Sequence, residues 1–328
     1  MRAAYYEKLG AARDVLRLGE VNVPEVGPGE VRVRVHTSGI NPSDVKRRGG
    51  QSMPSMPFPR VIPHQDGAGV IEAVGEGVSP ARVGEAVWLY RAQLGRPFGT
   101  AAEWVVVPSA QAVRLPAATD FAVGACLGVP AMTAHRCVFA DGPVSGQTIL
   151  VAGGAGAVSH YAIQLAKWGG AQVITTVSSA AKGEVALAAG ADHLINYRTE
   201  DVVARVHELT QGRGVDRVVE VAFSANLGLN ARMVKTNGVI ASYSAGPDNE
   251  PHLPYGAFST KNITIHFVLV YVMSEAAHQA AIEDITACLE NKSFRHPTIH
   301  RFGLDDIVTA HEGVESGQIV GKAMLTLA

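Results

Sequence analysis

The stretch ILVAGGAGAVSHYAIQLAKWG, residues 149–169, says more about the fold than any other part of the chain. A short apolar run leads into closely spaced glycines and then into a helical pattern, in which the residues that share one face are Val158, Tyr161, Ala162, Leu165 and Gly169. Gly153, Gly156 and Ser159 stand at the three positions of a GxxGxxG turn, where serine replaces the third glycine. Such a turn presents backbone N–H groups and a helix N-terminus to a pyrophosphate, and its glycines let the backbone approach closely. The stretch therefore predicts a dinucleotide-binding turn. The alternative is a helix-packing turn without a ligand.

The segments after this turn repeat the alternation of strand and helix. Apolar runs begin near residues 172, 193, 215, 238 and 262, and Ala-rich or amphipathic segments separate them. With the strand before the turn, they make the six strands of a doubly wound parallel sheet. The sequence thus predicts an α/β fold with a Rossmann domain over 124–270.

The first third of the chain has the pattern of β structure instead. In VRVRVH, residues 31–36, valines alternate with Arg and His, which predicts a half-buried strand. Four prolines between residues 53 and 63 predict a surface loop without helix. From about residue 274 we expect one helical segment and a final strand, KAMLTLA, that returns to this β-rich domain. Its expected bounds are 1–123 and 271–328.

Composition and charge narrow the class of protein. The 328 residues are 47% hydrophobic and carry Lys+Arg 28 against Asp+Glu 30, so a globular protein without an overall attraction to nucleic acid or anionic lipid is expected. The longest apolar run, 263–272, is too short to span a bilayer. Three cysteines without a CxxC pair fit a reducing compartment, and we expect the cytoplasm.

The residues after the second Rossmann strand indicate which dinucleotide binds. Sites selective for NAD place an acid about 20 residues beyond the glycine turn, but residues 173–181 contain none. Ser178, Ser179 and Lys182 offer hydroxyl groups and a cation that suit a 2′-phosphate. This predicts NADPH as the cofactor. The alternative is that the serines cap the next helix and Lys182 is solvated.

Several segments together make the chain resemble the medium-chain dehydrogenase/reductase superfamily, and within it the zinc-free quinone oxidoreductases related to ζ-crystallin. The resemblance is carried by SGINPSDVKRRGG (38–50), PHQDGAGVIEAVGEGV (63–78), LGVPAMTAH (127–135), the glycine turn, GADHLINYRTED (190–201), GRGVDRVVE (212–220) and the terminal IVGKAMLTL. It implies a GroES-like β domain completed by both chain ends, an inserted Rossmann domain, and an active site in the cleft between them.

The resemblance also bears on zinc. Zinc-dependent members have a cysteine ligand where this chain has Asn41, and a GHE motif where it has Pro63, His64 and Gln65. One remaining histidine does not make a tetrahedral site, so no metal is expected and His64 is expected to be a hydrogen-bonded histidine.

The resemblance assigns roles to two groups of residues. The substrate side is expected to comprise Asn41, Asp44, Lys46, Tyr90, Arg91 and Gln93. The cofactor side is expected to comprise Thr133, Gly153, Gly156, Ala157, Val158, Ser178, Ser179, Lys182, Tyr197, Phe267, Val268 and Leu269. Simpler interpretations stay open: Asn41, Pro42 and Asp44 suit the start of a helix, Lys46 suits a solvated surface, and Phe267 suits a buried sixth strand.

The expected activity is NADPH-dependent reduction of a quinone, by hydride or electron transfer and without a metal. One alternative is an NADPH-dependent enone or alkenal reductase. Another is a non-enzymatic NADPH-binding protein of crystallin type. The expected partners are a small-molecule quinone or α,β-unsaturated carbonyl and a second copy of the chain, with neither membrane nor nucleic acid. The dimer would form through the apolar run that follows residue 262.

Overall fold

The computed structural model describes residues 1–327, and the chain divides into two compact units. Unit 1 comprises Met1–Val129, Asp284–Glu290 and Pro297–Ala328, and unit 2 comprises Pro130–Glu283 and Asn291–His296. The bounds expected from the sequence, at 123 and 271, lie earlier in the chain than these divisions.

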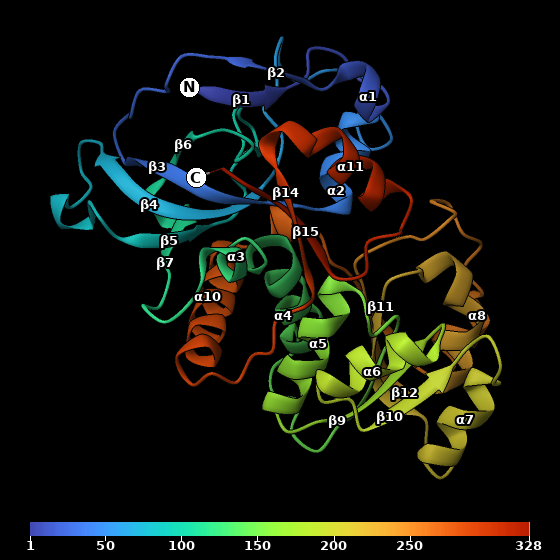
Figure 1. Cartoon of the computed structure of the whole chain (residues 1–328). Helices are drawn as coiled ribbons and strands as arrows, with labels where there is room; N and C mark the ends of the chain where they lie inside the picture. The colour runs from blue at the N-terminus through green and yellow to red at the C-terminus, as the bar shows by residue number, and fades with distance from the viewer. Residues whose placement is uncertain (328) are drawn as a thin grey trace. The chain divides into compact units, whose positions relative to one another are not determined.

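Unit 1 is built on antiparallel strands, as the valine alternation predicts. One sheet has the order β14-β15-β3-β4-β5-β7 with β6 paired to β3, and a separate pair joins β1 to β2 (Figure 1). The strands are β1 (Arg2–Tyr5), β2 (Arg17–Glu20), β3 (Glu30–Ile40), β4 (Asp66–Val74), β5 (Ala86–Leu89), β6 (Trp104–Pro108), β7 (Ala112–Arg114), β14 (Ile299–Gly303) and β15 (Lys322–Thr326).

Strand β3 confirms the predicted half-buried pattern, because its valines are buried while Arg34 is exposed. Both chain ends complete this unit. Strand β15 pairs antiparallel with β3, with Ala323 opposite Ile40, so the C-terminal segment forms a strand of this sheet. The helices of unit 1 are α1 (Ala12–Val15), α2 (Pro42–Arg48), α3 (Phe121–Gly124) and α11 (Ile307–Glu315).

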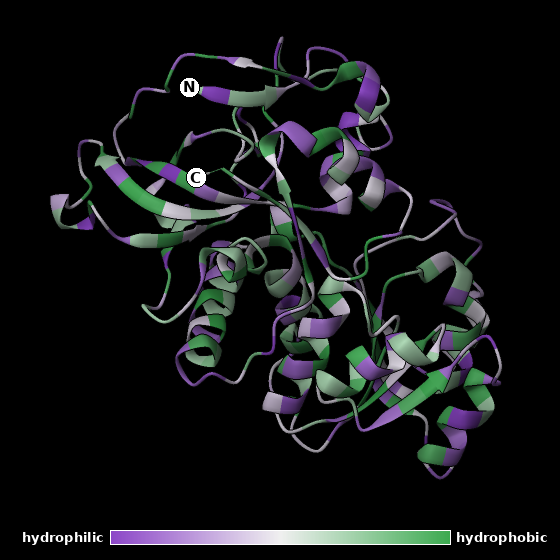
Figure 2. Cartoon of the chain, viewed as in Figure 1, coloured by the Kyte–Doolittle hydropathy of each residue, from purple (hydrophilic) through white to green (hydrophobic). Residues whose placement is uncertain are grey.

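Unit 2 is the predicted doubly wound sheet. Its six strands are all parallel in the order β10-β9-β8-β11-β12-β13, and hydrophobic residues gather along them (Figure 2). The bounds are β8 (Thr148–Val151), β9 (Gln172–Val177), β10 (His193–Asn196), β11 (Val215–Glu220), β12 (Val234–Ser242) and β13 (Thr264–Phe267).

The helices of unit 2 connect these strands. They are α4 (Met132–Phe139), α5 (Ala157–Trp168), α6 (Ala180–Ala188), α7 (Val202–Leu209), α8 (Phe223–Met233) and α9 (Tyr255–Ser259), while α10 (Glu275–Glu290) divides between the units. The C-terminal part thus holds two helices, α10 and α11, and the prediction of a single helical segment there is wrong. Helix α11, IVTAHEGVE, spans only nine residues and includes a threonine and a glycine, so its sequence carries a weak helical signal.

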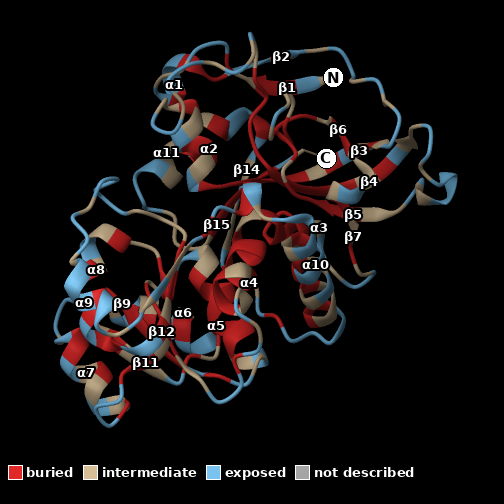
Figure 3. Cartoon of the chain, turned by 180° about the vertical axis from the view of Figure 1, so that it is seen from behind, coloured by how far each residue is buried: buried red, intermediate tan, exposed pale blue. Residues whose placement is uncertain are grey.

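Helix α5 departs from its predicted one-sided pattern. Residues 159–166 are all buried, so the helix is covered around its circumference (Figure 3). Helix α4 packs on one side, and the segment Asn291–His296 covers another through hydrogen bonds from His160 and Gln164 to the Arg295 carbonyl. No helix in residues 1–327 is long and apolar enough to cross a membrane.

Candidate functional site

The glycine turn lies between β8 and α5, as the sequence predicts. Gly153 has φ +67°, a left-handed conformation that glycine adopts without strain, and its N–H donates to Thr176 Oγ1 at 3.1 Å. Gly156 is the N-cap residue of α5 and is exposed. Helix α5 has twelve residues, and the N–H groups of its first turn, which includes Ala157 and Val158, have no partner within the helix.

The small residues of this turn are required by their neighbours. A Cβ on Gly154 would lie 2.3 Å from Thr175 Oγ1, so only glycine fits there. Ser159 is buried, and its hydroxyl donates to the Ala152 carbonyl at 2.8 Å and lies 3.1 Å from the Tyr243 hydroxyl. The serine that replaces the third glycine therefore ties helix α5 to the strand it follows.

A pocket of about 370 Å³ opens beyond the carboxyl ends of β8, β9 and β11. Its lining includes Gly153, Thr176, Tyr197 and Glu220. Ligands of open α/β sheets bind at this edge, and the pocket begins at the glycine turn, so it suits the adenosine half of a dinucleotide. Tyr197 follows β10 and is 52% exposed, which leaves its ring available to a ligand.

The segment after β9 contains the residues predicted to select NADPH. Ser178 is buried, whereas Ser179 is the N-cap of α6, and its hydroxyl accepts from the Lys182 N–H at 3.4 Å. Ser179 thus serves as the cap that the simpler interpretation predicts. Its donor hydrogen and the half-buried Lys182 ammonium remain compatible with a phosphate.

A second pocket, of about 480 Å³, opens beyond β12 and β13 and includes Ser242, Tyr243, Phe267, Val268 and Leu269. The interpretation of the sixth strand as buried is wrong. Phe267 is 75% exposed and Leu269 is 54% exposed, because β13 is the edge strand of the sheet. Val268 is buried, and its N–H donates to the Ser242 carbonyl at 2.7 Å.

Thr133, the remaining candidate on the cofactor side, is a buried residue in the first turn of α4. The structure therefore brings Gly153 and Tyr197 to one pocket of unit 2, and Phe267 to Leu269 to the other.

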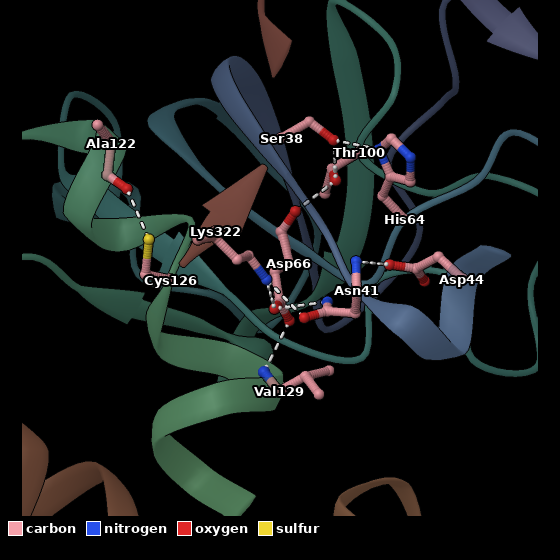
Figure 4. Close-up of polar contacts among 10 residues, drawn as sticks. All are labelled: Ser38, Asn41, Asp44, His64, Asp66, Thr100, Ala122, Cys126, Val129 and Lys322. Carbon is pink, nitrogen blue, oxygen red and sulfur yellow. Dashed lines mark hydrogen bonds and ion pairs between the residues drawn. The ribbon is translucent and has the colours of Figure 1, made fainter. Parts of the chain in front are cut away.

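Unit 1 holds a buried polar network around Asn41, the first candidate on the substrate side (Figure 4). Asn41 is the N-cap of α2, with Pro42 in the first turn, as the simpler interpretation predicts. Its side-chain amide donates to Asp66 Oδ2 at 2.8 Å, and its Oδ1 accepts from Lys322 Nζ at 2.5 Å. The Lys322 ammonium also pairs with Asp66 Oδ2 at 3.1 Å. Asn41 thus joins a buried ion pair as well as a helix start.

Asp44 closes the start of α2 from the other side. Its carboxylate accepts the Asn41 N–H at 2.8 Å. Burial raises the pKa of Asp44 to about 7, and the negative charge of Asp66 adds to this rise, while the Asn41 N–H, Lys322 and Arg47 act in the opposite direction. Near neutral pH this carboxyl group therefore changes its protonation state.

His64 belongs to a chain of hydrogen bonds in the same unit. Its Nδ1 lies 2.8 Å from Ser38 Oγ, which lies 2.7 Å from Thr100 Oγ1, and the Thr100 hydroxyl donates to the Asp66 carbonyl at 2.6 Å. On the other side, His64 Nε2 lies 2.8 Å from His311 Nε2. The prediction of a hydrogen-bonded histidine is confirmed.

The direction of each proton in this chain follows from the last bond. Thr100 donates its hydrogen to the carbonyl, so it accepts from Ser38, and Ser38 in turn accepts from His64 Nδ1. Burial and the neighbouring charges lower the pKa of His64 well below its ordinary value, so the ring is neutral and its Nε2 accepts from His311. Both histidines are therefore neutral, each with one hydrogen in a fixed place.

The other substrate candidates differ in exposure. Lys46 is exposed on α2. Tyr90 and Gln93 are buried, and the Gln93 side chain accepts from Arg47 at 2.8 Å and donates to the Arg96 carbonyl at 2.8 Å. Arg91 is half-buried with φ +57°. Of these side chains, Lys46 is the one most open to a substrate.

Comparisons with known proteins cover the whole chain. Residues 27–117 match the family model of the alcohol dehydrogenase GroES-like domain, and residues 157–287 match that of the zinc-binding dehydrogenases. The quinone oxidoreductase of Rattus norvegicus is 30% identical over 333 residues, which are 100% of this chain and 98% of that protein. The chain belongs to the quinone oxidoreductase family of the medium-chain dehydrogenases/reductases.

Solved structures agree with this family assignment. A mycobacterial protein complexed with NADPH is 25% identical with a TM-score of 0.88, and a protein described as an NAD-dependent alcohol dehydrogenase is 28% identical with a TM-score of 0.90. Each comparison covers 100% of both chains. The chain is thus an NAD(P)-dependent oxidoreductase with a GroES-like domain and a Rossmann domain.

Within this family, the positions of the zinc ligands carry other bonds here. His64 Nδ1 lies within hydrogen-bond distance of Ser38, and its Nε2 within that of His311. The Asn41 amide donates to Asp66 and accepts from Lys322. Among residues 1–327 no three His, Cys, Asp or Glu side chains gather as a metal site. The donor set next to Asn41 already includes an ammonium group, which disfavours a second cation.

Sequence reasoning missed Asp66 and Lys322, the most deeply buried charges of this network. Lys322 opens a strand whose next three residues are buried, and a lone cation in that place is a signal that it needs a buried partner. It also missed Glu220 and Asn230, which lie at the end of β11 and on α8 and line the first pocket.

Proposed function

We propose that the chain is an NADPH-dependent, zinc-independent oxidoreductase that reduces quinones. Zinc independence is supported by the ion pair of Lys322 and Asp66 next to Asn41. Asn41 stands where zinc-dependent members have a cysteine ligand, and the Lys322 ammonium group already supplies positive charge beside it. The quinone substrate is supported by the activity after which the relatives are named.

The residues of unit 2 fit the dinucleotide. The open N-terminus of α5 and the glycine turn would bind the pyrophosphate, and Ser178, Ser179 and Lys182 would bind the 2′-phosphate. Thr133 and the segment 267–269 would lie at the nicotinamide. When bound, the nicotinamide supplies the hydride or electrons for the reduction.

We assign the substrate side to Asn41, Asp44, Lys46 and the loop of residues 90–93. Lys46 is the exposed cation among them, and a positive charge stabilises the negative charge that develops on a quinone oxygen. Asn41 and Asp44 would act from the start of α2, where their bonds hold its first turn in place. These roles concern position and charge, because the cofactor carries the reactive group.

We also propose a homodimer formed through β13, because this strand lies at the edge of its sheet and the turn that follows it leaves Val272 exposed. The cytoplasm is proposed from the three cysteines, which are buried and free of disulfides.

Oxidation of NADPH and of NADH by the purified protein, followed by absorbance against a panel of quinones, enones and aldehydes, tests the activity. We expect turnover with quinones that exceeds turnover with enones, and no loss of rate after dialysis against a chelator. A preference for enones would replace the quinone assignment, and one tightly held zinc per chain would refute the zinc-independent assignment.

Lys182→Ala tests the choice of cofactor. We expect it to weaken NADPH on the order of tenfold and to leave NADH within about twofold, because a phosphate–ammonium contact is lost only with NADPH. Lys167→Ala, at a partly exposed lysine of the same unit that pairs with Asp192, is the matched control and should change neither affinity. An equal loss for both dinucleotides would remove Lys182 from the phosphate site.

A further inference from the structure

A buried carboxylate at the end of β11 has no part in the roles assigned above. Glu220 is 1% exposed. Its Oε1 accepts the Ala222 N–H at 2.6 Å and the Asn226 amide at 3.0 Å, and its Oε2 accepts the Asn230 amide at 2.7 Å. Three donors thus hold both oxygens of this carboxylate in place.

These bonds fix the orientation of Asn230. Its Nδ2 must face Glu220, because the reverse orientation would set an amide oxygen against a carboxylate oxygen. Asn230 Oδ1 is then the opposite end of the amide, and it is buried without a hydrogen-bond partner among the described residues. An unpaired buried acceptor costs about 1–3 kcal/mol, so this atom indicates a donor that the chain itself does not provide.

Glu220, Asn226 and Asn230 line the pocket that begins at Gly153. Much of the remaining lining is apolar, including Val202, Leu229 and Met233, and suits a flat ring system. Among the described side chains of this lining, the buried polar atom without a partner is the acceptor Asn230 Oδ1, so the pocket favours a ring that carries a donor on its edge.

We propose that Asn230, oriented by Glu220, recognises the exocyclic amino group of the adenine ring of the dinucleotide. Adenine carries an N–H₂ donor at the position where hypoxanthine carries a carbonyl oxygen. An acceptor in the pocket binds the first and repels the second. This assignment rests on the proposed function, since it deepens how the same site binds its cofactor.

The first experiment compares two cofactors on the wild-type protein. NADPH and its analogue with hypoxanthine in place of adenine are titrated separately, and binding is followed by the fluorescence of the reduced nicotinamide. We expect the analogue to bind on the order of tenfold more weakly, because its carbonyl faces Asn230 Oδ1. Equal affinities would overturn the inference and leave the proposed function intact. Absence of binding by both cofactors would refute the proposed function.

Glu220→Gln provides the second experiment, because it should reverse the preference. The Gln side chain must keep its oxygen toward the Ala222 and Asn226 donors, so its amide nitrogen faces Asn230. Asn230 then turns to accept from that nitrogen and presents its own N–H₂ to the pocket. We expect the hypoxanthine analogue to bind at least as tightly as NADPH in this variant.

Glu208→Gln, the same change at an exposed position on α7, is the matched control and should keep the wild-type ratio. A Glu220→Gln protein that melts lower but keeps that ratio would show a purely structural role and overturn the inference. Should this variant fail to fold, the wild-type ratio of the two affinities decides alone.

Discussion

The polar network of unit 1 and the cofactor pocket of unit 2 differ in where their polar groups find hydrogen-bond partners. Around Asp66, buried polar groups make their hydrogen bonds to one another, as Asn41 and Lys322 do (Figure 4). Around Gly153, the chain supplies glycines, an open helix N-terminus and an amide oxygen without a partner. Buried polar groups that hydrogen-bond to one another hold one arrangement of the chain, whereas polar groups left without a partner are available to a ligand.

The largest expected effect is in the polar network around Asp66. Lys322→Met leaves the buried Asp66 carboxylate without its cation, so we expect a loss of about 3–5 kcal/mol in the free energy of unfolding, measured by urea denaturation. The double variant Lys322→Met/Asp66→Asn removes both charges and should recover much of this loss. If the single variant is as stable as the wild type, the pair does not hold unit 1 together.

The next largest effect is expected at the glycine turn of the cofactor pocket. Gly156→Val should weaken NADPH on the order of a hundredfold, because a side chain at the N-terminus of α5 enters the path of the pyrophosphate. The melting temperature should change little, since Gly156 is exposed with φ −73° and a Cβ there would lie 3.4 Å from its nearest neighbour, the Gly153 carbonyl. Gly154→Val is the contrast: its Cβ has no room, so that protein should lose stability as well. Unchanged NADPH affinity in Gly156→Val would contradict the assigned pyrophosphate site.

The two regions also differ in how far the sequence predicts them. The glycine turn is local: strand, glycines and helix follow one another within residues 148–168, so the pattern alone predicts both the fold of unit 2 and the binding turn. The parallel sheet of six strands follows from the same alternation of strands and helices.

The network of unit 1 depends instead on strand register. Asp66 lies opposite Gly39 on β3, and Ala323 lies opposite Ile40, so two neighbouring strands bring Asp66 and Lys322 to Asn41 from 25 and 281 positions away. No local pattern contains that pairing. For Phe267 the sequence leaves both a buried strand and an exposed contact open for a related reason, because an apolar run does not reveal whether its strand lies at the edge of a sheet.

The smallest expected effect distinguishes the histidine pair from the ion pair within unit 1. Burial, together with the positive charge of Arg48, lowers the pKa of His311 to about 3. The unfolded chain therefore binds a proton at this residue below about pH 6.5 while the folded chain does not, so its contribution makes the protein less stable as pH falls through this range. The raised pKa of Asp44 acts in the opposite direction between about pH 4 and 7, because there the folded state binds the extra proton.

His311→Gln isolates the histidine contribution, because a glutamine amide can donate to His64 Nε2 and does not titrate. Between pH 6.5 and 5 we expect the wild type to lose about 1.6 kcal/mol more than this variant, measured as the free energy of unfolding in urea at each pH. His252→Gln, the same change at an exposed histidine, is the matched control and should follow the wild-type profile. Parallel pH profiles for wild type and His311→Gln would show that the pair accepts a proton in the folded state. The neutral, ordered chain from His311 to Thr100 would then be wrong, while the ion pair at Asp66 would be unaffected.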